Sequence, residues 1–134
     1  MKHASTKERG AAAIEFALVL PILVLLIVGI FEFGRLFNVQ LTLSNAAREG
    51  ARVMAINDDP SEARSAAIAA APVLNPAITD GQIDVSPDSC DDNPGDQVEV
   101  VITYEVALIA PDFWEWATGD AFTLQGKGQM VCGG

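Results

Sequence analysis

The residues of this 134-residue chain whose types and spacing could do chemistry are few. They are a glutamate in an apolar run, a pair of cysteines and a group of aspartates. Glu15 is the single charge between Ala11 and Phe31. Because an ionised carboxylate is costly at membrane depth, such a residue usually marks a partner or a site. The other interpretation is that Glu15 lies near enough to the membrane interface to reach water, and position alone does not separate the two.

The chain lacks the residue combinations of the common catalytic sites. Its one histidine is His3, and the sequence has no G-x-S-x-G motif, no phosphate-binding glycine loop and no metal-ligand spacing. We therefore expect neither enzymatic activity nor a bound cofactor.

The formal net charge of -10 is unevenly distributed. Residues 1–52 carry six Lys/Arg and four acids, whereas residues 53–134 carry only Arg64 and Lys127 against fourteen acids. An acidic surface repels phosphate, and the chain has no Lys/Arg cluster that would neutralise a nucleic-acid backbone. We therefore expect no nucleic-acid partner, and the apolar fraction of 50% argues against disorder.

The first element that must position these residues is a long apolar helix. The run from Ala11 to Phe31 has 21 residues. A helix of that length spans about 31 Å, which matches the hydrocarbon core of a bilayer. The ten preceding residues carry three Lys/Arg and one acid, so the positive-inside bias holds the N-terminus in the cytoplasm. We predict a basic leader at residues 1–10 and a membrane span at residues 11–31.

The helical pattern continues beyond the apolar run with a period close to 3.6. The two helical rows are Phe37, Leu41, Ser44, Asn45, Arg48 and Arg52 on one side, and Leu36, Val39, Leu43, Ala47 and Ala51 on the other. Arg48, Glu49 and Arg52 are spaced for local contacts, so they form either a solvated ion network or a subunit contact. We predict one helix over residues 11–57, with a kink at Pro21.

The remaining residues, 58–134, predict a small α+β head outside the membrane. The segment Ser61 to Ala71 is rich in alanine and predicts a second, short helix. Alternation of apolar and polar residues predicts strands at residues 82–86 and 97–109. With a third strand at residues 121–131, we expect about three antiparallel strands. The predicted apolar face of the middle strand consists of Val98, Val100, Ile102, Tyr104 and Val106.

Cys90 and Cys132 both fall in this head, where an oxidising compartment favours a disulfide. Their pairing would close a loop of about 42 residues and stabilise the head by about 4 kcal/mol in the chain-entropy model. The alternative is a reactive or metal-binding thiol pair, but the C-x-x-C spacing and companion histidines are missing. We predict a structural disulfide.

Two further clusters of residues in the head each allow two interpretations. The string DSCDDNPGD contains Asp88, Asp91, Asp92 and Asp96, whose carboxylate oxygens make a weak candidate for a calcium site. The residue order of an EF-hand loop is absent, so a solvated acidic turn is favoured. Phe113, Trp114 and Trp116 form the only aromatic cluster and belong either to the core of the head or to a partner contact.

The stretch from Arg9 to Ala55 combines a basic leader ending in glycine, a Glu-Phe pair, a proline-containing apolar run, and the strings E-F-G-R and N-A-A-R-E-G-A-R. This combination resembles the TadE-like pseudopilins, which are minor pilin-like subunits of tight-adherence (Flp-type, type IVb-related) pilus systems. Shaft-forming pilins of these systems have Glu-Tyr where this chain has Glu15 and Phe16, and they are much shorter after the helix. The resemblance therefore favours a minor subunit over the major pilin.

The resemblance implies that a prepilin peptidase at the cytoplasmic face cuts between Gly10 and Ala11. Glu15 would then be the fifth residue of the mature chain and would neutralise the amino terminus of a neighbouring subunit, which sets the register of assembly. The implied partners are the peptidase, other pilin-like subunits and the bacterial inner membrane. The alternative is an uncleaved single-pass membrane scaffold whose head acts within an envelope secretion system.

Overall fold

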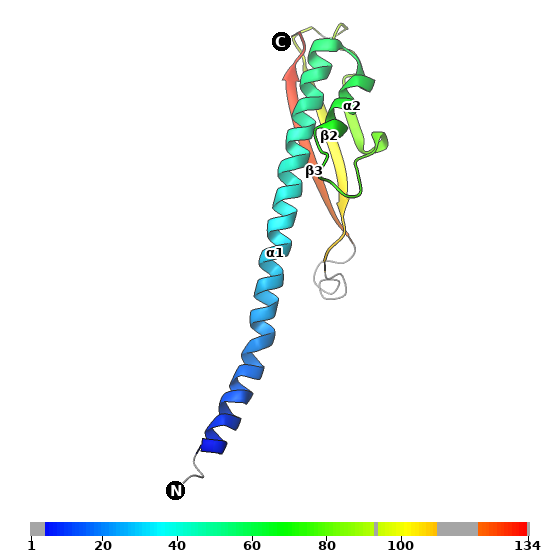
Figure 1. Ribbon diagram of the computed structural model, residues 1–134. Helices are drawn as coiled ribbons and strands as arrows, with labels where there is room; N and C mark the ends of the chain where they lie inside the picture. The colour runs from blue at the N-terminus through cyan, green and yellow to red at the C-terminus, as the bar shows by residue number, and fades with distance from the viewer. Residues whose placement is uncertain (1–4, 93, 110–120, 134) are drawn as a thin grey trace. The chain divides into compact units, whose positions relative to one another are not determined.

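The computed structural model describes residues 5–92, 94–109 and 121–133. Within these residues the chain forms a long helix, a short helix, a turn of 3-10 helix and a three-stranded sheet (Figure 1). The chain divides into two compact units, Met1–Arg35 and Leu36–Gly134. The α+β class predicted from the sequence is confirmed, and the unit that holds the sheet also includes the C-terminal part of the long helix.

Helix α1 extends from Ser5 to Asn57. It begins before Ala11, the predicted start, because residues 5–10 contain no proline and include good helix formers such as Lys7 and Glu8. Pro21 lies inside α1, and the helix continues on both sides of it. The kink at Pro21 stays a prediction.

The C-terminal end of α1 is fixed by two consecutive aspartates. Asp58 adopts a left-handed backbone conformation with φ of 49°, and its N–H donates to the carbonyl of Met54 at 3.0 Å. This is the αL type of helix C-cap, and aspartate is one of the few residues besides glycine that adopts it. Asp59 then caps the N-terminus of α2 (Pro60–Ala69), and Pro60 occupies the first turn of that helix, where a missing N–H has no cost.

The sheet has the strand order β1-β2-β3, and both strand pairs are antiparallel. Strand β1 is Ile83–Ser86, β2 is Gln97–Val106, and β3 is Phe122–Val131. A 3-10 turn, η1, covers Asp80–Gln82 just before β1. These strands match the predicted ones to within a few residues, and the predicted apolar face of β2 is buried at every position.

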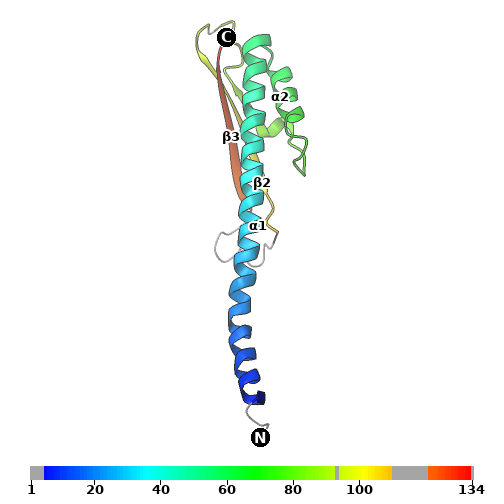
Figure 2. The same cartoon turned by 60° about the vertical axis from the view of Figure 1, so that its left-hand side comes forward.

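The C-terminal part of α1 covers one face of the sheet (Figure 2). Of the two helical rows, the one with Leu43, Ala47 and Ala51 is buried in the core together with Met54. The other row, which includes Phe37, Leu41 and Arg48, is exposed. The helix therefore supplies one wall of the core of this unit, with β2 and α2 supplying the others.

Two glycines of β3 let α1 approach the sheet very closely. A Cβ atom at Gly128 would overlap the carbonyl group of Ala47 and the backbone nitrogen of Arg48, and one at Gly126 would lie 2.7 Å from the Cβ of Leu43. Only a residue without a side chain fits at such backbone-to-backbone contacts. The same stretch carries a polar link, because Gln40 Nε2 donates to the carbonyl of Gln125 at 2.7 Å.

Candidate functional site

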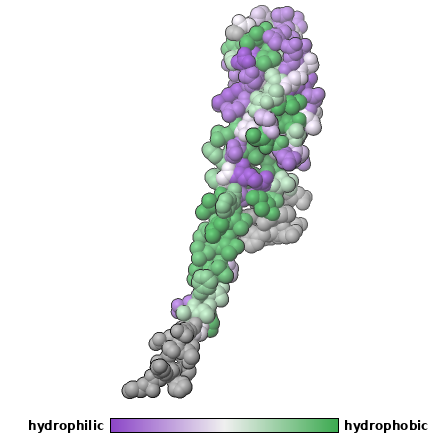
Figure 3. All heavy atoms as spheres, viewed as in Figure 1, coloured by the Kyte–Doolittle hydropathy of each residue, from purple (hydrophilic) through white to green (hydrophobic). Residues whose placement is uncertain are grey.

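The N-terminal unit presents an apolar helix surface whose described residues are almost all exposed. The residues between Gly10 and Ile27 are exposed without exception, and they include Phe16 at 62% and Leu18 at 70%. The helix is long and apolar enough to cross a membrane, with a mean hydropathy of 2.9 over its best window. Figure 3 shows this continuous hydrophobic surface in green. A helix that is apolar all round must be covered by lipid or by other helices.

Glu15 lies on this apolar surface and is exposed. Among the side chains that the structure describes, none forms an ion pair with it. A carboxylate that is to be placed in an apolar medium needs a cation or a set of donors, since an unpaired buried charge is strongly unfavourable. The described residues of one copy provide no ion pair for Glu15, so a partner molecule or interfacial water must stabilise its charge.

Gly10 and Ala11 lie within α1 and are exposed. An added Cβ at Gly10 would meet nothing within 4 Å, so no packing reason in the structure requires glycine there. In a helix, glycine costs about 1 kcal/mol relative to alanine because it loses more backbone entropy. At Gly10 the helix thus unwinds more easily than it would with alanine at this position.

The C-terminal end of the apolar run carries an ion pair. Arg35 donates to Glu32 at 3.0 Å, three residues apart, as the sequence spacing predicts. The Glu32 side chain is only 6% exposed, whereas Arg35 is 38% exposed. The pair neutralises the one carboxylate that this unit buries among its described residues.

A second ion pair lies on the exposed face of α1 in the other unit. Arg52 makes two hydrogen bonds to Glu49, at 3.0 and 2.6 Å. The hydrogen bond from Arg52 lowers the pKa of Glu49 below its ordinary value, and the same bond raises the pKa of Arg52. Both groups are solvated, so this pair adds little to stability.

Cys90 and Cys132 form the disulfide that the sequence predicts. The bond ties the loop before β2 to the end of β3, and Cys132 N–H also donates to the carbonyl of Asp96 at 2.9 Å. No free cysteine is present in the described chain, which removes the reactive-thiol alternative for these two residues.

Asp58 connects the end of α1 to the disulfide loop, a role that sequence reasoning missed. Its carboxylate accepts the hydroxyl of Ser89 at 3.0 Å, the backbone N–H of Cys90, and the backbone N–H of Asp91 at 3.3 Å. The N–H of Cys90 is the main reason that the pKa of Asp58 is lowered. The string Asn-Asp-Asp-Pro signals a helix end, but no local pattern reveals that the first aspartate binds a loop more than thirty residues away.

The carboxylates of the acidic loop, residues 88–96, do not form a cation site in the described part of the chain. Asp88, Asp91, Asp92 and Asp96 are all exposed, and the described residues contain no group of three or more His, Cys, Asp or Glu arranged to hold a metal ion. The backbone of this loop instead donates to Asp58. Phe113, Trp114 and Trp116 lie outside the described residues.

The two aspartates at the helix junction predict a loss of stability in acid. The pKa values of Asp58 and Asp59 both lie below the ordinary 3.8, Asp59 because Ser61 and the first backbone N–H groups of α2 donate to it. A lowered folded-state pKa contributes stability above the ordinary value that is lost as the pH falls through the folded value. We therefore expect the urea midpoint of the chain to fall as the pH drops below 3.8.

A double variant, Asp58→Asn with Asp59→Asn, tests the cause of that loss. Asparagine keeps an acceptor oxygen but does not ionise, so the variant should show a flatter stability profile in acid. The matched control, Asp88→Asn with Asp92→Asn, changes two exposed carboxylates of the neighbouring loop and should keep the native slope. Equal slopes for the two double variants would contradict the assignment.

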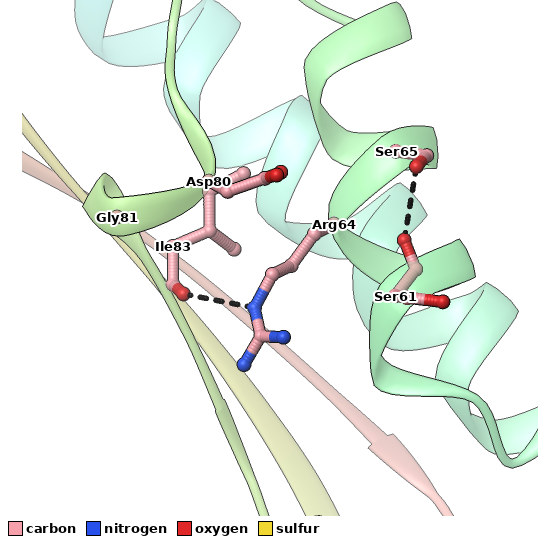
Figure 4. A pocket seen from close by; sticks show the side chains of 6 residues that line it. All are labelled: Ser61, Arg64, Ser65, Asp80, Gly81 and Ile83. Atoms are coloured by element: carbon pink, nitrogen blue, oxygen red, sulfur yellow. Dashed lines mark hydrogen bonds between the residues drawn. The ribbon is translucent and has the colours of Figure 1, made fainter.

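A cleft of about 430 Å³ lies between α2 and the segment η1–β1 (Figure 4). Arg64 reaches across it, and its Nε donates to the carbonyl of Ile83 at 3.4 Å. Ser65 is committed to the helix, because its hydroxyl donates to the carbonyl of Ser61 at 2.9 Å. The cleft is lined by Ser61, Arg64, Ser65, Asp80, Gly81 and Ile83. It lacks a nucleophile with an adjacent base, and Arg64 acts there as a link between α2 and the outer edge of β1.

The comparisons with known proteins bear on α1. A family model described as TadE-like protein matches residues 10–52. The matched segment starts at Gly10, contains Glu15, Phe16 and Pro21, and ends inside the part of α1 that packs on the sheet. This match confirms the resemblance seen in the sequence. Searches of curated proteins and of solved structures return no match.

Proposed function

Because residues 10–52 are TadE-like, we propose that this chain is a minor pilin-like subunit of a tight-adherence pilus system. In this proposal α1 anchors the chain in the bacterial inner membrane, with the N-terminus in the cytoplasm and the head outside. A prepilin peptidase removes residues 1–10, and the mature chain joins other pilin-like subunits through the apolar helix. The role is structural and not catalytic.

The observation that carries the proposal is a single carboxylate on an otherwise apolar, exposed helix surface. Glu15 lies five residues after Gly10 and has no ion pair among the described residues. Cleavage after Gly10 would create a positive amine at Ala11. When apolar helices pack together, that amine and a Glu15 from the adjacent subunit satisfy each other, whereas a misplaced subunit leaves two buried charges unpaired.

The helical state of Gly10 has a consequence for processing. A protease binds its substrate in an extended form, so residues around Gly10 must leave the helix before the bond to Ala11 is cut. Glycine lowers the free energy of that unwinding by about 1 kcal/mol relative to alanine. The absence of a side chain also removes a steric obstacle next to the scissile bond.

Mass spectrometry of protein from cells that express the peptidase tests the proposal. We expect the native chain to begin at Ala11, and Gly10→Ala to accumulate with Met1 retained. Gly29→Ala is the matched control, because Gly29 is also a helical glycine with nothing within 4 Å of an added Cβ. An intact Met1 on the native chain in such cells would sink the proposal and favour the uncleaved scaffold.

Glu15→Gln separates processing from assembly. The variant keeps the size of the side chain but removes the charge, so we expect normal cleavage and loss of co-purification with other pilin-like subunits. Glu49→Gln, which changes a solvated carboxylate on the same helix, should leave both properties unchanged. Retention of partner subunits by Glu15→Gln would show that Glu15 only reaches interfacial water.

A further inference from the structure

The face of α1 that points away from the sheet has no partner within the described part of the unit Leu36–Gly134. Phe37 is 57% exposed and Leu41 is 49% exposed on this face, and Arg48 and Arg52 follow about two and three turns after Leu41. Aromatic and arginine side chains are the types enriched in the centres of protein interfaces. We call this surface, defined by Phe37, Leu41, Arg48 and Arg52, the helix ridge.

Arg48 is the one cation of this unit for which the described residues provide neither an ion pair nor a hydrogen bond. Arg52 is bound to Glu49, Lys127 lies 3.5 Å from Glu99, and Arg64 donates to Ile83. Arg48 is exposed between the apolar part of the ridge and Arg52. The ridge therefore has a net positive charge in a chain whose total charge is -10.

The opposite side of the same unit is the outward face of the sheet, which is acidic. Asp84 of β1 and Glu105 of β2 are exposed there and make no ion pair among the described residues. They line a shallow cleft of about 470 Å³ together with Gln82 and Thr103. The third acid of this face, Glu99, is already engaged by Lys127 and by Gln129.

The two surfaces lie at nearly the same height along the head. Gly128 lies against the backbone of Ala47 and Arg48, it pairs with Val100 in the sheet, and Val100 pairs with Val85. Asp84 immediately precedes Val85. Two copies of this unit that lie side by side in the same orientation would therefore bring Arg48 of one copy level with Asp84 of the next, without an axial shift.

We propose that the helix ridge of one copy docks on the outward sheet face of a second copy, with Arg48 between Asp84 and Glu105. The ridge and the sheet face are different surfaces on opposite sides of the unit, so the contact is heterologous and each docked copy still offers one free surface of each kind. The chain thus forms side-by-side rows through its heads. This association goes beyond the proposed function, since it requires neither cleavage at Gly10 nor pairing of Glu15.

Zero-length crosslinking of the full chain in lipid vesicles tests the contact. A water-soluble carbodiimide joins an amine to a carboxylate only at contact distance, so Arg48→Lys should give a dimer in which position 48 is joined to Asp84 or Glu105. Mixing of ¹⁵N-labelled and unlabelled chains identifies bonds between copies by mass spectrometry. The link from Lys127 to Glu99 within one copy serves as an internal control, since these groups lie 3.5 Å apart.

Charge reversal tests whether the pairing is specific. Arg48→Glu should weaken self-association in vesicles about tenfold or more, the effect of losing one close interfacial charge pair. Adding Asp84→Arg and Glu105→Arg to Arg48→Glu should restore it. The matched control adds Asp88→Arg and Asp92→Arg instead, which gives the same net charge with the reversed residues in the acidic loop, and it should not restore association.

Two results would overturn the proposal. One is a set of crosslinks from position 48 that never reaches the sheet face of another copy. The other is equal recovery of association by the two charge-matched sets, which would mean that net charge alone controls it. Far-UV circular dichroism and an intact disulfide confirm that each variant is folded before either result is read.

Discussion

Replacing Gly128 with alanine is expected to destabilise the head by about 3 kcal/mol, at the upper end of the cost of overpacking a core. The physical reason is that the new methyl group would occupy the space of the Ala47 carbonyl and the Arg48 nitrogen. Backbone atoms of a helix do not move aside as a flexible side chain does, so α1 and β3 must separate. Separation of these elements would also open the core cluster to which Leu43, Ala51 and the buried residues of β2 belong.

Urea unfolding of the full chain in micelles measures this effect. Gly81→Ala is the matched control, because an added Cβ at Gly81 meets nothing within 4 Å. We expect Gly81→Ala to have a midpoint close to the native one and Gly128→Ala to have a much lower one. Equal midpoints for the two variants would show that α1 does not pack against β3 at the distance described above.

Removing the disulfide is expected to have the largest effect on the unfolding equilibrium. Cys90 and Cys132 are 42 residues apart, and a loop of that size corresponds to about 4 kcal/mol in the chain-entropy model. The bond also closes the end of the unit at which Asp58, the acidic loop and the last residues of β3 meet. Its loss frees the loop that supplies two backbone donors to Asp58.

The double variant Cys90→Ser with Cys132→Ser tests this expectation by urea unfolding. Reduction of the native chain should lower the midpoint to that of the double variant, and the same reductant should leave the double variant unchanged. If the reduced native chain keeps its original midpoint, the entropy of the closed loop is not an important part of the stability of the head.

Periodicity in the sequence predicted β2 and the C-terminal part of α1 well because each has one clear pattern. The strand with Val98, Val100 and Ile102 alternates strictly, and its predicted face is the buried one. The row of α1 with Leu43, Ala47 and Ala51 consists of small or apolar residues at helical spacing and is buried, as such a row should be. A helix end was also evident at Asn57, since two aspartates and a proline follow it.

Contacts between distant residues were not predictable in the same way. The string Gln-Gly-Lys-Gly-Gln at 125–129 has a poor strand propensity and gives no sign that α1 lies directly upon it. Asp58 similarly has its partners in a loop that local patterns assign to solvent or to calcium. In both cases the missing information is which surfaces meet. Local sequence patterns do not specify this.

The packing of α1 on the sheet limits which segments of this protein can be exchanged with those of related chains. The sequence alone places a boundary at residue 57, between a helical stem and a head, yet Leu43, Ala47 and Met54 belong to the same core as β2. A head that began at Asp58 would have lost one wall of its core. A head exchanged between related chains would therefore have to include the helix from Leu36 onward together with the sheet. Residues 36–57 and the sheet are thus expected to be inherited as one unit.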